Sequence, residues 1–352
     1  MKKCFYLLVL ALISVIAVAQ TNQVVWNDGQ VQFAVPITNV DSLTFPTDNA
    51  LTVDTLHLLL PRSMKQIVHD TIYQDRMVAV HDTIYLYDCD YCNNIGFSVS
   101  ASQQVRFASG NLRCITTTTP YTWYFAEHQY DILGDANVKN SALADTIDLF
   151  GWSSDNTATQ FGVSTSTTAS DYSGNFVDWG TKIGDGSTWR TLTMDEWVYL
   201  LKTRTNATSL YGVACIYLTA DSSQYVNGLI LLPDNWQCPN GITFKSGYID
   251  MYSYRQDTGQ QKLNIDPTCA DYQSFSLSQW LRLENAGAIF LPFAGFRSGT
   301  SISYVQKRVS YWSSTLNSTE RPYNATFSVA EVAGDYACGI SMGISVRLVQ
   351  NK

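Results

Sequence analysis

The sequence predicts an α+β fold in which short strands outnumber helices. Two helix-start signals stand among many short apolar runs of strand length, a pattern typical of a mixed sheet-and-helix domain. Charged residues make up only 15% of the 352-residue chain, while aromatic residues make up 13%. This composition favours a strand-rich exported protein over a cytosolic helical enzyme. The apolar fraction of 45% is sufficient for a sizeable core.

Residues 1–19 are expected to be a secretory signal peptide. Lys2 and Lys3 supply the positive start, residues 5–16 the apolar core, and residues 17–19, Ala-Val-Ala, the cleavage site. The core is too short to span a bilayer permanently, so no transmembrane segment is expected after cleavage. Cys4 precedes the apolar core, whereas a lipoprotein cysteine would follow it. We therefore expect an exported protein, at the cell surface, in the periplasm or outside the cell, and not a lipoprotein.

Residues 20–52 are expected to form a small module of short strands. The tripeptide Asn-Asp-Gly at 27–29 follows the apolar residues 24–26 and precedes an alternating segment at 31–35. Asp-Gly supports the positive φ angles of a two-residue hairpin loop, so these segments predict a β-hairpin. A further strand is expected at 40–45.

Residues 53–94 are expected to be an extended repeat linker, or stalk. The segment 68–73, Val-His-Asp-Thr-Ile-Tyr, recurs at 80–85, and its alternation of β-branched and polar residues is typical of extended chain. The repeated His69 and His81 have no neighbouring ligands that would complete a metal site, so repetition of a spacer unit explains them better. For the Cys-x-x-Cys pair that ends this segment, a local disulfide or free thiols are favoured over a redox or metal pair.

Asp-Ser/Thr-aliphatic triplets resemble the O-glycosylation acceptor of anaerobic gut bacteria. A glycan is bulky and solubilising, which would suit an exposed stalk. The triplet is short, so chance occurrence is the alternative. The acceptor hydroxyls would be those of Ser42, Thr55, Thr71, Thr83 and Thr146.

Residues 95–352 are expected to form one large domain. Residues 97–100 and 104–107 predict paired strands, and further strands are expected at 228–233 and 288–292. Residues 151–190 are rich in Ser, Thr, Asp, Gly and Trp, which predicts long loops.

Two capping boxes predict the helices of this domain. Thr193 is followed by Glu196, and Ser276 by Gln279, in each case ahead of apolar residues at helical spacing. Gly287 is the expected end of the second helix.

A set of motifs occurs in a recognisable order across residues 95–350. The motifs are Val105–Leu112, Phe125–Tyr130, Asp148–Trp152, Leu231–Trp236, Ala286–Pro292, Ala294–Arg297, Tyr311–Ser314 and Ser345–Val349. This set resembles a family of exported proteins of gut anaerobes that contain a C-type lectin-like domain. That fold is shared with formylglycine-generating enzymes and with binding proteins diversified by retroelements. The resemblance implies two helices, a twisted antiparallel sheet and long loops.

In diversified relatives of this kind the ligand surface lies in the loops before the last strand, which corresponds to residues 315–342 here. Tyrosine and tryptophan are strong anchors at interfaces, and short polar side chains supply adaptable hydrogen bonds. For Trp312 a place in the core is the favoured alternative. The candidate ligand-binding residues are Trp312, Asn317, Glu320, Tyr323, Asn324, Asp335 and Tyr336.

Enzymatic chemistry is not favoured. A formylglycine-type oxidase needs paired thiols near the C-terminus, where only Cys338 is found, and iron enzymes need several histidines, whereas His128 is alone after residue 95. No cofactor is expected, although a structural calcium ion within residues 151–190 stays an alternative. The formal net charge of −8 and the absence of Lys/Arg runs argue against nucleic acid and anionic membranes as partners.

We therefore expect an exported, non-catalytic recognition protein that binds a protein or glycan at the cell exterior through its C-terminal loops. One alternative is a formylglycine-generating-type or degenerate metal-dependent enzyme, which a stoichiometric redox metal would favour. A second alternative is a structural surface or adhesin component, which self-assembly would favour.

Overall fold

The computed structural model describes the secondary structure of residues 24–27, 30–33 and 57–58. It describes residues 95–184, 188–247, 273–317, 321–328 and 330–352 in full. The chain divides into two compact units, Met1–Asn94 and Ile95–Lys352. In the part of the chain described here, no helix has both the length and the apolar character needed to cross a membrane.

The N-terminal unit contains a β-hairpin. Strand β1 (Val24–Asn27) pairs antiparallel with β2 (Gln30–Phe33), and Asn27 lies opposite Gln30. This register confirms the hairpin that the sequence predicts. Strand β3 (His57–Leu58) pairs with β2 in parallel. The expected strand at 40–45, the repeats at 68–73 and 80–85, and the cysteine pair at 89 and 92 lie outside the described residues, as do Ser42, Thr55, Thr71 and Thr83.

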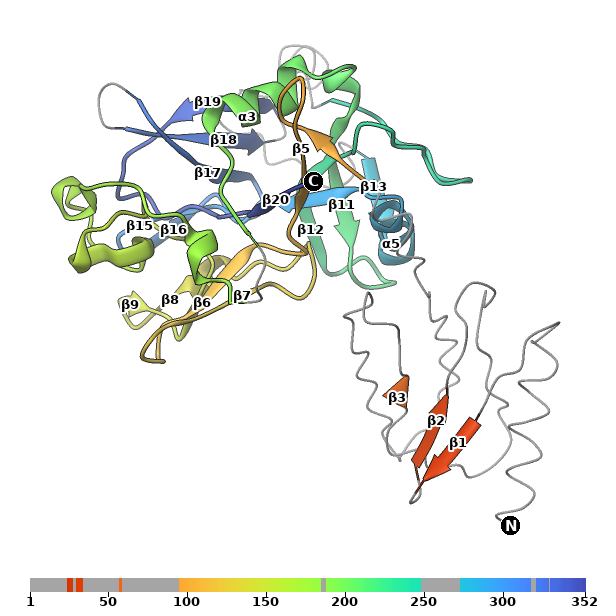
Figure 1. Ribbon diagram of the computed structural model, residues 1–352, viewed down its shortest axis with the longest axis horizontal. Coiled ribbons are helices and arrows are strands. Elements are labelled where there is room, and N and C mark those ends of the chain that lie inside the picture. The colour runs from red at the N-terminus through yellow and green to blue at the C-terminus, as the bar shows by residue number, and fades with distance from the viewer. Residues whose placement is uncertain are drawn as a thin grey trace. The chain divides into compact units, whose positions relative to one another are not determined.

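The C-terminal unit is a mixed α+β fold made mostly of strands, as predicted (Figure 1). Its strands form several small sheets that are mostly antiparallel. The first sheet contains β4 (Phe97–Ser98), β5 (Gln104–Phe107) and β20 (Val349–Asn351). The second contains β6 (Leu112–Ile115), β7 (Thr122–Phe125) and β10 (Thr146–Ile147). Two hairpins are formed by β8 (Val138–Lys139) with β9 (Ala142–Leu143) and by β15 (Phe296–Ser298) with β16 (Ser301–Ser303).

A four-stranded sheet packs against α5 (Leu277–Asn285), the longest helix among the described residues. Its strand order is β13 (Gln273–Ser276), β11 (Tyr211–Tyr217), β12 (Tyr225–Leu231) and β14 (Ile289–Pro292), and only β11 and β13 run parallel. Helix α5 begins at the predicted capping box of Ser276 and Gln279. Its face toward the sheet buries Trp280, whose ring lies 5.4 Å from that of Phe290.

The predicted glycine stop of α5 is confirmed. Gly287 adopts a φ of +91°, a left-handed conformation that glycine tolerates without strain. Its N–H donates to the Glu284 carbonyl at 2.8 Å, and the Ala288 N–H donates to the Leu283 carbonyl at 3.0 Å. These two hydrogen bonds form a Schellman motif, which satisfies carbonyls that the last helical turn would otherwise leave unpaired.

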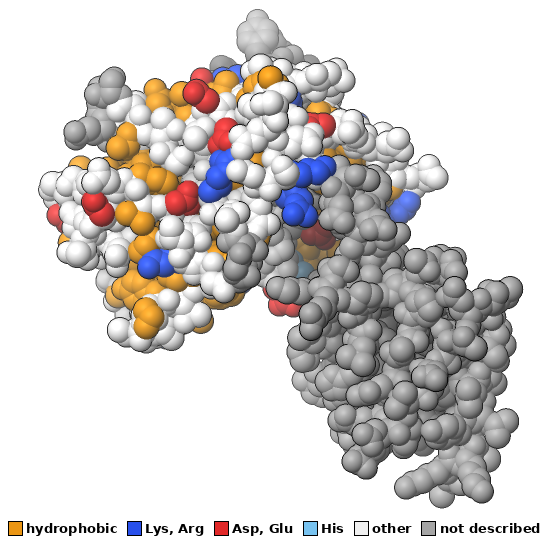
Figure 2. Space-filling model, viewed as in Figure 1, with side chains coloured by type: hydrophobic (Ala, Val, Ile, Leu, Met, Phe, Trp, Pro, Cys, Tyr) orange, Lys and Arg blue, Asp and Glu red, His pale blue; other side chains and the backbone are white. Residues whose placement is uncertain are grey.

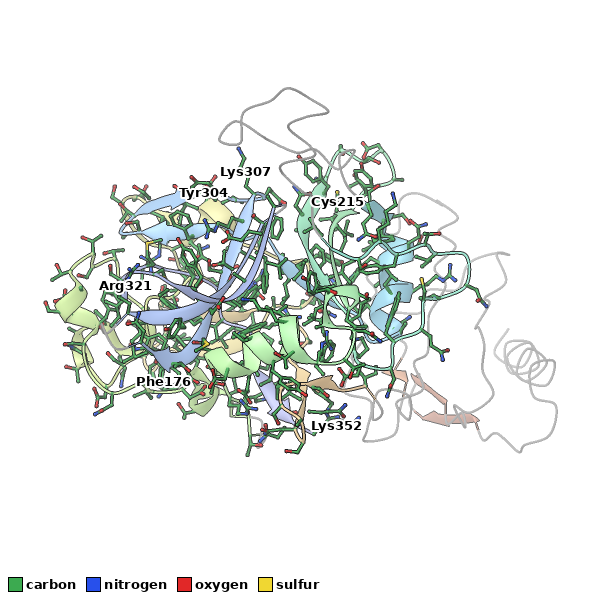
Figure 3. All side chains as sticks on the ribbon, turned by 90° about the horizontal axis from the view of Figure 1, so that it is seen from above. Phe176, Cys215, Tyr304, Lys307, Arg321 and Lys352 are labelled. Atoms are coloured by element: carbon green, nitrogen blue, oxygen red, sulfur yellow. The ribbon has the colours of Figure 1, made fainter. Side chains whose placement is uncertain are left out.

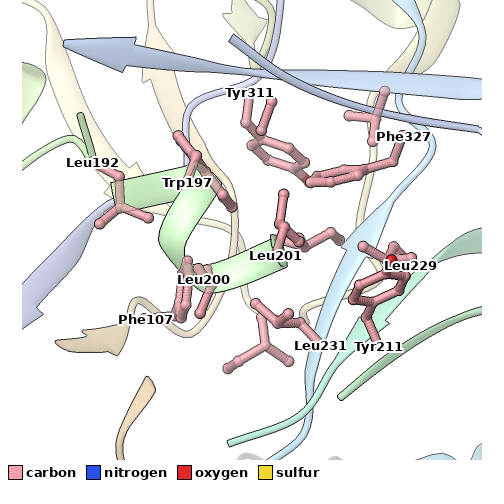
Figure 4. Close-up of a cluster of buried hydrophobic side chains, with 14 of the residues drawn as sticks. Phe107, Leu192, Trp197, Leu200, Leu201, Tyr211, Leu229, Leu231, Tyr311 and Phe327 are labelled. Carbon is pink, nitrogen blue, oxygen red and sulfur yellow. The ribbon is translucent and has the colours of Figure 1, made fainter. Parts of the chain in front are cut away.

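The first predicted helix is also confirmed, and it lies over the core. Helix α3 (Met194–Val198) starts at the capping box of Thr193 and Glu196 and continues as a π-helical turn, η6 (Tyr199–Thr203). Trp197 is fully buried and packs against Tyr311 and Phe327, with ring centroids 6.3 and 6.1 Å from its own. Figure 4 shows Trp197 and Leu201 on the side of Tyr311 and Phe327, and Leu200 beside Phe107.

A second core lies beneath the irregular region that the sequence predicts at 151–190. Trp152, Trp179 and Trp312 are buried here, with ring centroids of Trp152 and Trp312 5.4 Å apart. The chain in this region runs through short 3-10 turns and isolated bridges instead of paired strands. The 3-10 turns of the unit are η2 (Gly134–Asn137), η3 (Thr157–Gly162), η4 (Ala169–Tyr172), η5 (Trp179–Lys182) and η7 (Ala207–Ser209).

Candidate ligand-binding surface

The region expected to form ligand-binding loops is largely a regular sheet. Strands β17 (Arg308–Leu316), β18 (Pro322–Ser328) and β19 (Glu331–Ala337) pair antiparallel in that order. The expectation of loops across 315–342 is therefore wrong for most of this segment. The alternation of polar and apolar residues from Asn324 to Ser328 is a strand signal. It does not show that the polar side chains are exposed, because both faces of this strand are buried from Asn324 to Phe327.

Two of the predicted ligand-binding residues are buried. Trp312 is 1% exposed, and its indole N–H donates to the Phe150 carbonyl at 2.7 Å. Asn324, opposite Trp312 in the register, is fully buried, and its Oδ1 accepts from the Thr326 hydroxyl at 2.7 Å. The burial of both side chains confirms the core alternative for Trp312 and corrects the expectation that Asn324 is a surface residue.

Two further candidates belong to the side of the sheet that faces α3. Asp335 forms an exposed ion pair with Lys202 of η6, with Nζ and Oδ1 3.0 Å apart. Tyr323 is half-buried, and the register places it one residue away from the Asn324–Tyr336 pair. Because successive side chains of a strand point to opposite faces, Tyr323 and Tyr336 do not share a surface.

Tyr336 is the predicted aromatic residue whose side chain is exposed. It is 43% exposed and lies on the same face as Trp312 and Asn324. The guanidinium of Arg308 lies over its ring, 5.2 Å from the ring centroid. Arg308 also lies 3.5 Å from the carboxylate of Glu331. The Tyr336 ring therefore has a cation over one face, an arrangement that is attractive because of the ring quadrupole.

The turn that joins β17 to β18 supplies a second cation. The Arg321 N–H donates to Asn317 Oδ1 and the Asn317 N–H donates to the Arg321 carbonyl, both at 2.9 Å. The Arg321 guanidinium donates to the Ala337 carbonyl at the end of β19. Glu320 lies outside the described residues. We call the set Arg308, Arg321, Glu331 and Tyr336 the Arg308–Tyr336 surface.

The Arg308–Tyr336 surface contains single charged groups of both signs. Arg308 and Arg321 both lie near the Cys338 thiol, whose pKa burial nevertheless raises to about 12. That thiol is therefore protonated and unreactive at neutral pH. On the face shown in Figure 2, charged side chains of both signs are scattered among polar and apolar ones rather than gathered into one patch. A ligand of this unit would meet aromatic and single charged groups, not a broad field of one sign.

The structure buries two arginines, Arg347 and Arg297. Arg347 is 1% exposed, and it donates to the amide oxygens of Gln129 and Asn111 at 2.7 and 3.3 Å. Burial lowers the pKa of Arg347 to about 10. Arg297 donates to the carbonyls of Gly299 and Leu149. Both side chains therefore act as hydrogen-bond donors that satisfy internal oxygens.

The remaining candidates of the sequence do not come together as a site. Thr146 lies half-buried in β10, where it is paired with Ile115 of β6. His128 is exposed and stacks on Tyr130, with ring centroids 5.0 Å apart. Within the described ranges, no three His, Cys, Asp or Glu side chains are grouped as ligands of a metal ion would be. Cys215 is disulfide-bonded, while Cys114, Cys238 and Cys338 are free.

Comparison of the chain with models of protein families, with curated proteins and with solved structures finds no match.

Proposed function

We propose that the chain is an exported, non-catalytic recognition protein that binds a protein ligand through the Arg308–Tyr336 surface of a C-type lectin-like domain. The observation that carries the proposal is the half-exposed Tyr336 ring, which is fixed beneath the Arg308 guanidinium at 5.2 Å. Exposed aromatic rings bind best when their conformation is restricted beforehand, because less entropy is lost on association.

The residue types of this surface favour a protein partner. Tyrosine and arginine are the side chains most enriched among the residues that dominate binding energy at protein interfaces. Arg308 lies over the ring and pairs with Glu331, and Arg321 donates to the carbonyl of the next residue, Ala337. These groups add donors and an acceptor, which suits a mixed polar rim. The sheet beneath is rigid, since Phe327 and Tyr311 pack against Trp197 on its opposite face. Export and the lectin-like fold enter this proposal from the sequence alone.

The proposal is tested by screening the full-length mature chain against arrays of extracellular proteins and of glycans. Tyr336→Ala is expected to weaken binding of the protein ligand by about tenfold or more, because it removes the central anchor. Arg308→Lys keeps the charge but loses the flat guanidinium, so an intermediate loss is expected.

Tyr225→Ala is the matched control, because Tyr225 is a strand tyrosine that is 41% exposed, close to the 43% of Tyr336. It is expected to bind like the unaltered chain. Protein binding that survives Tyr336→Ala would place the site elsewhere, and binding to glycans alone through Tyr336 would contradict the choice of a protein ligand. Near-ultraviolet circular dichroism shows whether each variant keeps its fold.

A further inference from the structure

Tyr304 is a second exposed aromatic residue, and it lies in a turn with a strained backbone. Residues 304–307 connect β16 to β17, and Tyr304 and Gln306 adopt φ angles of +62° and +65°. Both are non-glycine residues in the left-handed region, where a bulky side chain is an outlier. Two such residues within one short turn persist only when their surroundings determine the conformation.

Hydrogen bonds from three segments fix this turn. The Gln306 N–H donates to the Phe293 carbonyl at 2.8 Å, and the Gln306 side-chain oxygen accepts from the Asn227 N–H at 2.7 Å. The Asn227 side chain donates to the Gln306 carbonyl at 2.9 Å. The Lys307 and Arg308 N–H groups both donate to the Tyr304 carbonyl at 3.0 Å. The position of Tyr304 is therefore set by the backbone and not by burial of its ring.

The ring of Tyr304 is exposed on one face only. Tyr304 is 55% exposed, the largest value among the exposed large hydrophobic side chains of the described residues. It stacks on Phe296 with ring centroids 5.3 Å apart and an interplanar angle of 21°. Phe296 thus covers one face, and the opposite face is left to solvent. Figure 3 shows Tyr304 beside Lys307 at the edge of the unit.

Hydroxyl groups line the same side of the β15–β16 hairpin. In its register Phe296 lies opposite Ser303 and Ser298 opposite Ser301, while Arg297, which points to the other face, is fully buried. Alternation along the strands therefore puts Phe296 and these three serines on the face opposite Arg297. On this face Phe296 is half-buried against the second core, while Ser298 and Ser301 are exposed and Ser303 is half-buried. We call Phe296, Ser298, Ser301, Ser303 and Tyr304 the Tyr304 platform.

We infer that the Tyr304 platform binds a neutral hexopyranose ring of a glycan by face-on stacking. The C–H bonds on one side of a pyranose form a flat, weakly positive surface, which matches the negative face of an aromatic ring. The hydroxyl groups at the edge of the sugar would then meet the serine hydroxyls of the hairpin. The hydroxyl groups of the platform suit a neutral polyol, whereas the Tyr336 ring is flanked by charged side chains.

The inference goes beyond the proposed function, because the platform contains none of the residues of the Arg308–Tyr336 surface. It is tested on the full-length chain by saturation-transfer difference NMR. The probes are the methyl glycosides of glucose, mannose, galactose and N-acetylglucosamine at millimolar concentration. Transfer is expected to the C–H protons on one side of the ring of at least one of these probes.

Two substitutions at Tyr304 distinguish the contribution of the aromatic ring to sugar binding from that of the turn conformation. Asparagine tolerates the left-handed conformation, so Tyr304→Asn is expected to keep the fold and weaken the responding sugar about tenfold, as loss of aromatic stacking predicts. Tyr304→Phe keeps the stacking face and is expected to stay within about threefold of the unaltered chain.

Tyr121→Ala removes a tyrosine that is 42% exposed elsewhere, and it is expected to change nothing, as is Tyr336→Ala. Absence of transfer to all four glycosides overturns the inference, and so does transfer that persists in a folded Tyr304→Asn. Failure of protein binding through Tyr336 would leave these NMR results unaffected, so the two proposals fail separately.

Discussion

Single buried side chains connect the surface of the C-terminal unit to its centre. Glu284 of α5 accepts from the Gln129 side chain at 2.8 Å, and Gln129 in turn accepts from Arg347 at 2.7 Å. Arg347 continues to Asn111, which also accepts from the Tyr311 hydroxyl at 3.1 Å. Burial raises the pKa of Glu284 and of Tyr311. Such a chain fixes a unique packing of the core only while every member keeps its partner.

Stability is expected to depend on the protonation of Glu284. Because burial raises the pKa of Glu284 in the folded state, against the opposing effects of Gln129, Arg347 and His128, the folded state holds its proton more tightly than the unfolded state. The stabilising contribution is present below the unfolded pKa of about 4.3 and is lost as the pH rises through the folded pKa. The free energy of unfolding relative to Glu284→Gln should therefore fall as the pH rises above about 4 and through the folded-state pKa.

The measurement is urea unfolding of both proteins at a series of pH values. Glu127→Gln controls for the loss of one negative charge, because Glu127 is an exposed neighbour of the same network. A difference between the unaltered chain and Glu284→Gln that does not change with pH would contradict the assignment.

The helices and several strands follow from local signals, whereas the candidate site does not. Capping boxes at Thr193 and Ser276 predict both helix starts because a side chain and the backbone satisfy each other within four residues. The place of Asn324 depends on its neighbours Thr326, Trp312 and Tyr336 across three strands, and no local pattern encodes that. Tyr304 was missed for a similar reason, because its exposure is imposed by contacts from Phe293 and Asn227.

The end of α5 gives the prediction at the scale of one element. Gly287→Ala is expected to lower the free energy of unfolding by about 1–3 kcal/mol, because alanine is strained at a left-handed φ. A Cβ atom at this position would also lie 2.8 Å from the Ile95 side chain. Gly184→Ala is the matched control, since a Cβ there meets no atom within 4 Å, and its effect should stay within about 0.5 kcal/mol. Equal effects of both substitutions on urea unfolding would contradict this account of the helix end.

At the scale of the whole molecule, the unit that begins at Ile95 contains a complete core. Phe97 is 1% exposed and packs edge-to-face against Phe107, with ring centroids 5.1 Å apart. Ser98 donates from its backbone and hydroxyl to Asp234 at 3.0 and 2.7 Å. Strand β4 is thus part of this unit, although it lies only two residues after the division of the chain.

A protein made of residues 95–352 is therefore expected to fold, with a melting temperature within about 3 °C of the same transition in the full chain. A shorter protein of residues 99–352 lacks Phe97 and the Ser98–Asp234 hydrogen bonds, so it should melt at least about 5 °C lower. Differential scanning calorimetry distinguishes the two. Equal melting temperatures for both proteins would show that β4 contributes nothing to the unit.

Because β20 pairs with β5, one strand of this pair is synthesised long before the other. A chain leaves the ribosome from its N-terminal end, so β5 appears early and waits for residues 349–351, which form its other neighbour. Arg347, which donates to Asn111 and Gln129, is also synthesised late. Contacts between segments so distant along the chain close slowly. The C-terminal unit consequently reaches its final packing only after residue 351 has been synthesised. Until then β5 presents an open edge, which other proteins, chaperones included, can occupy.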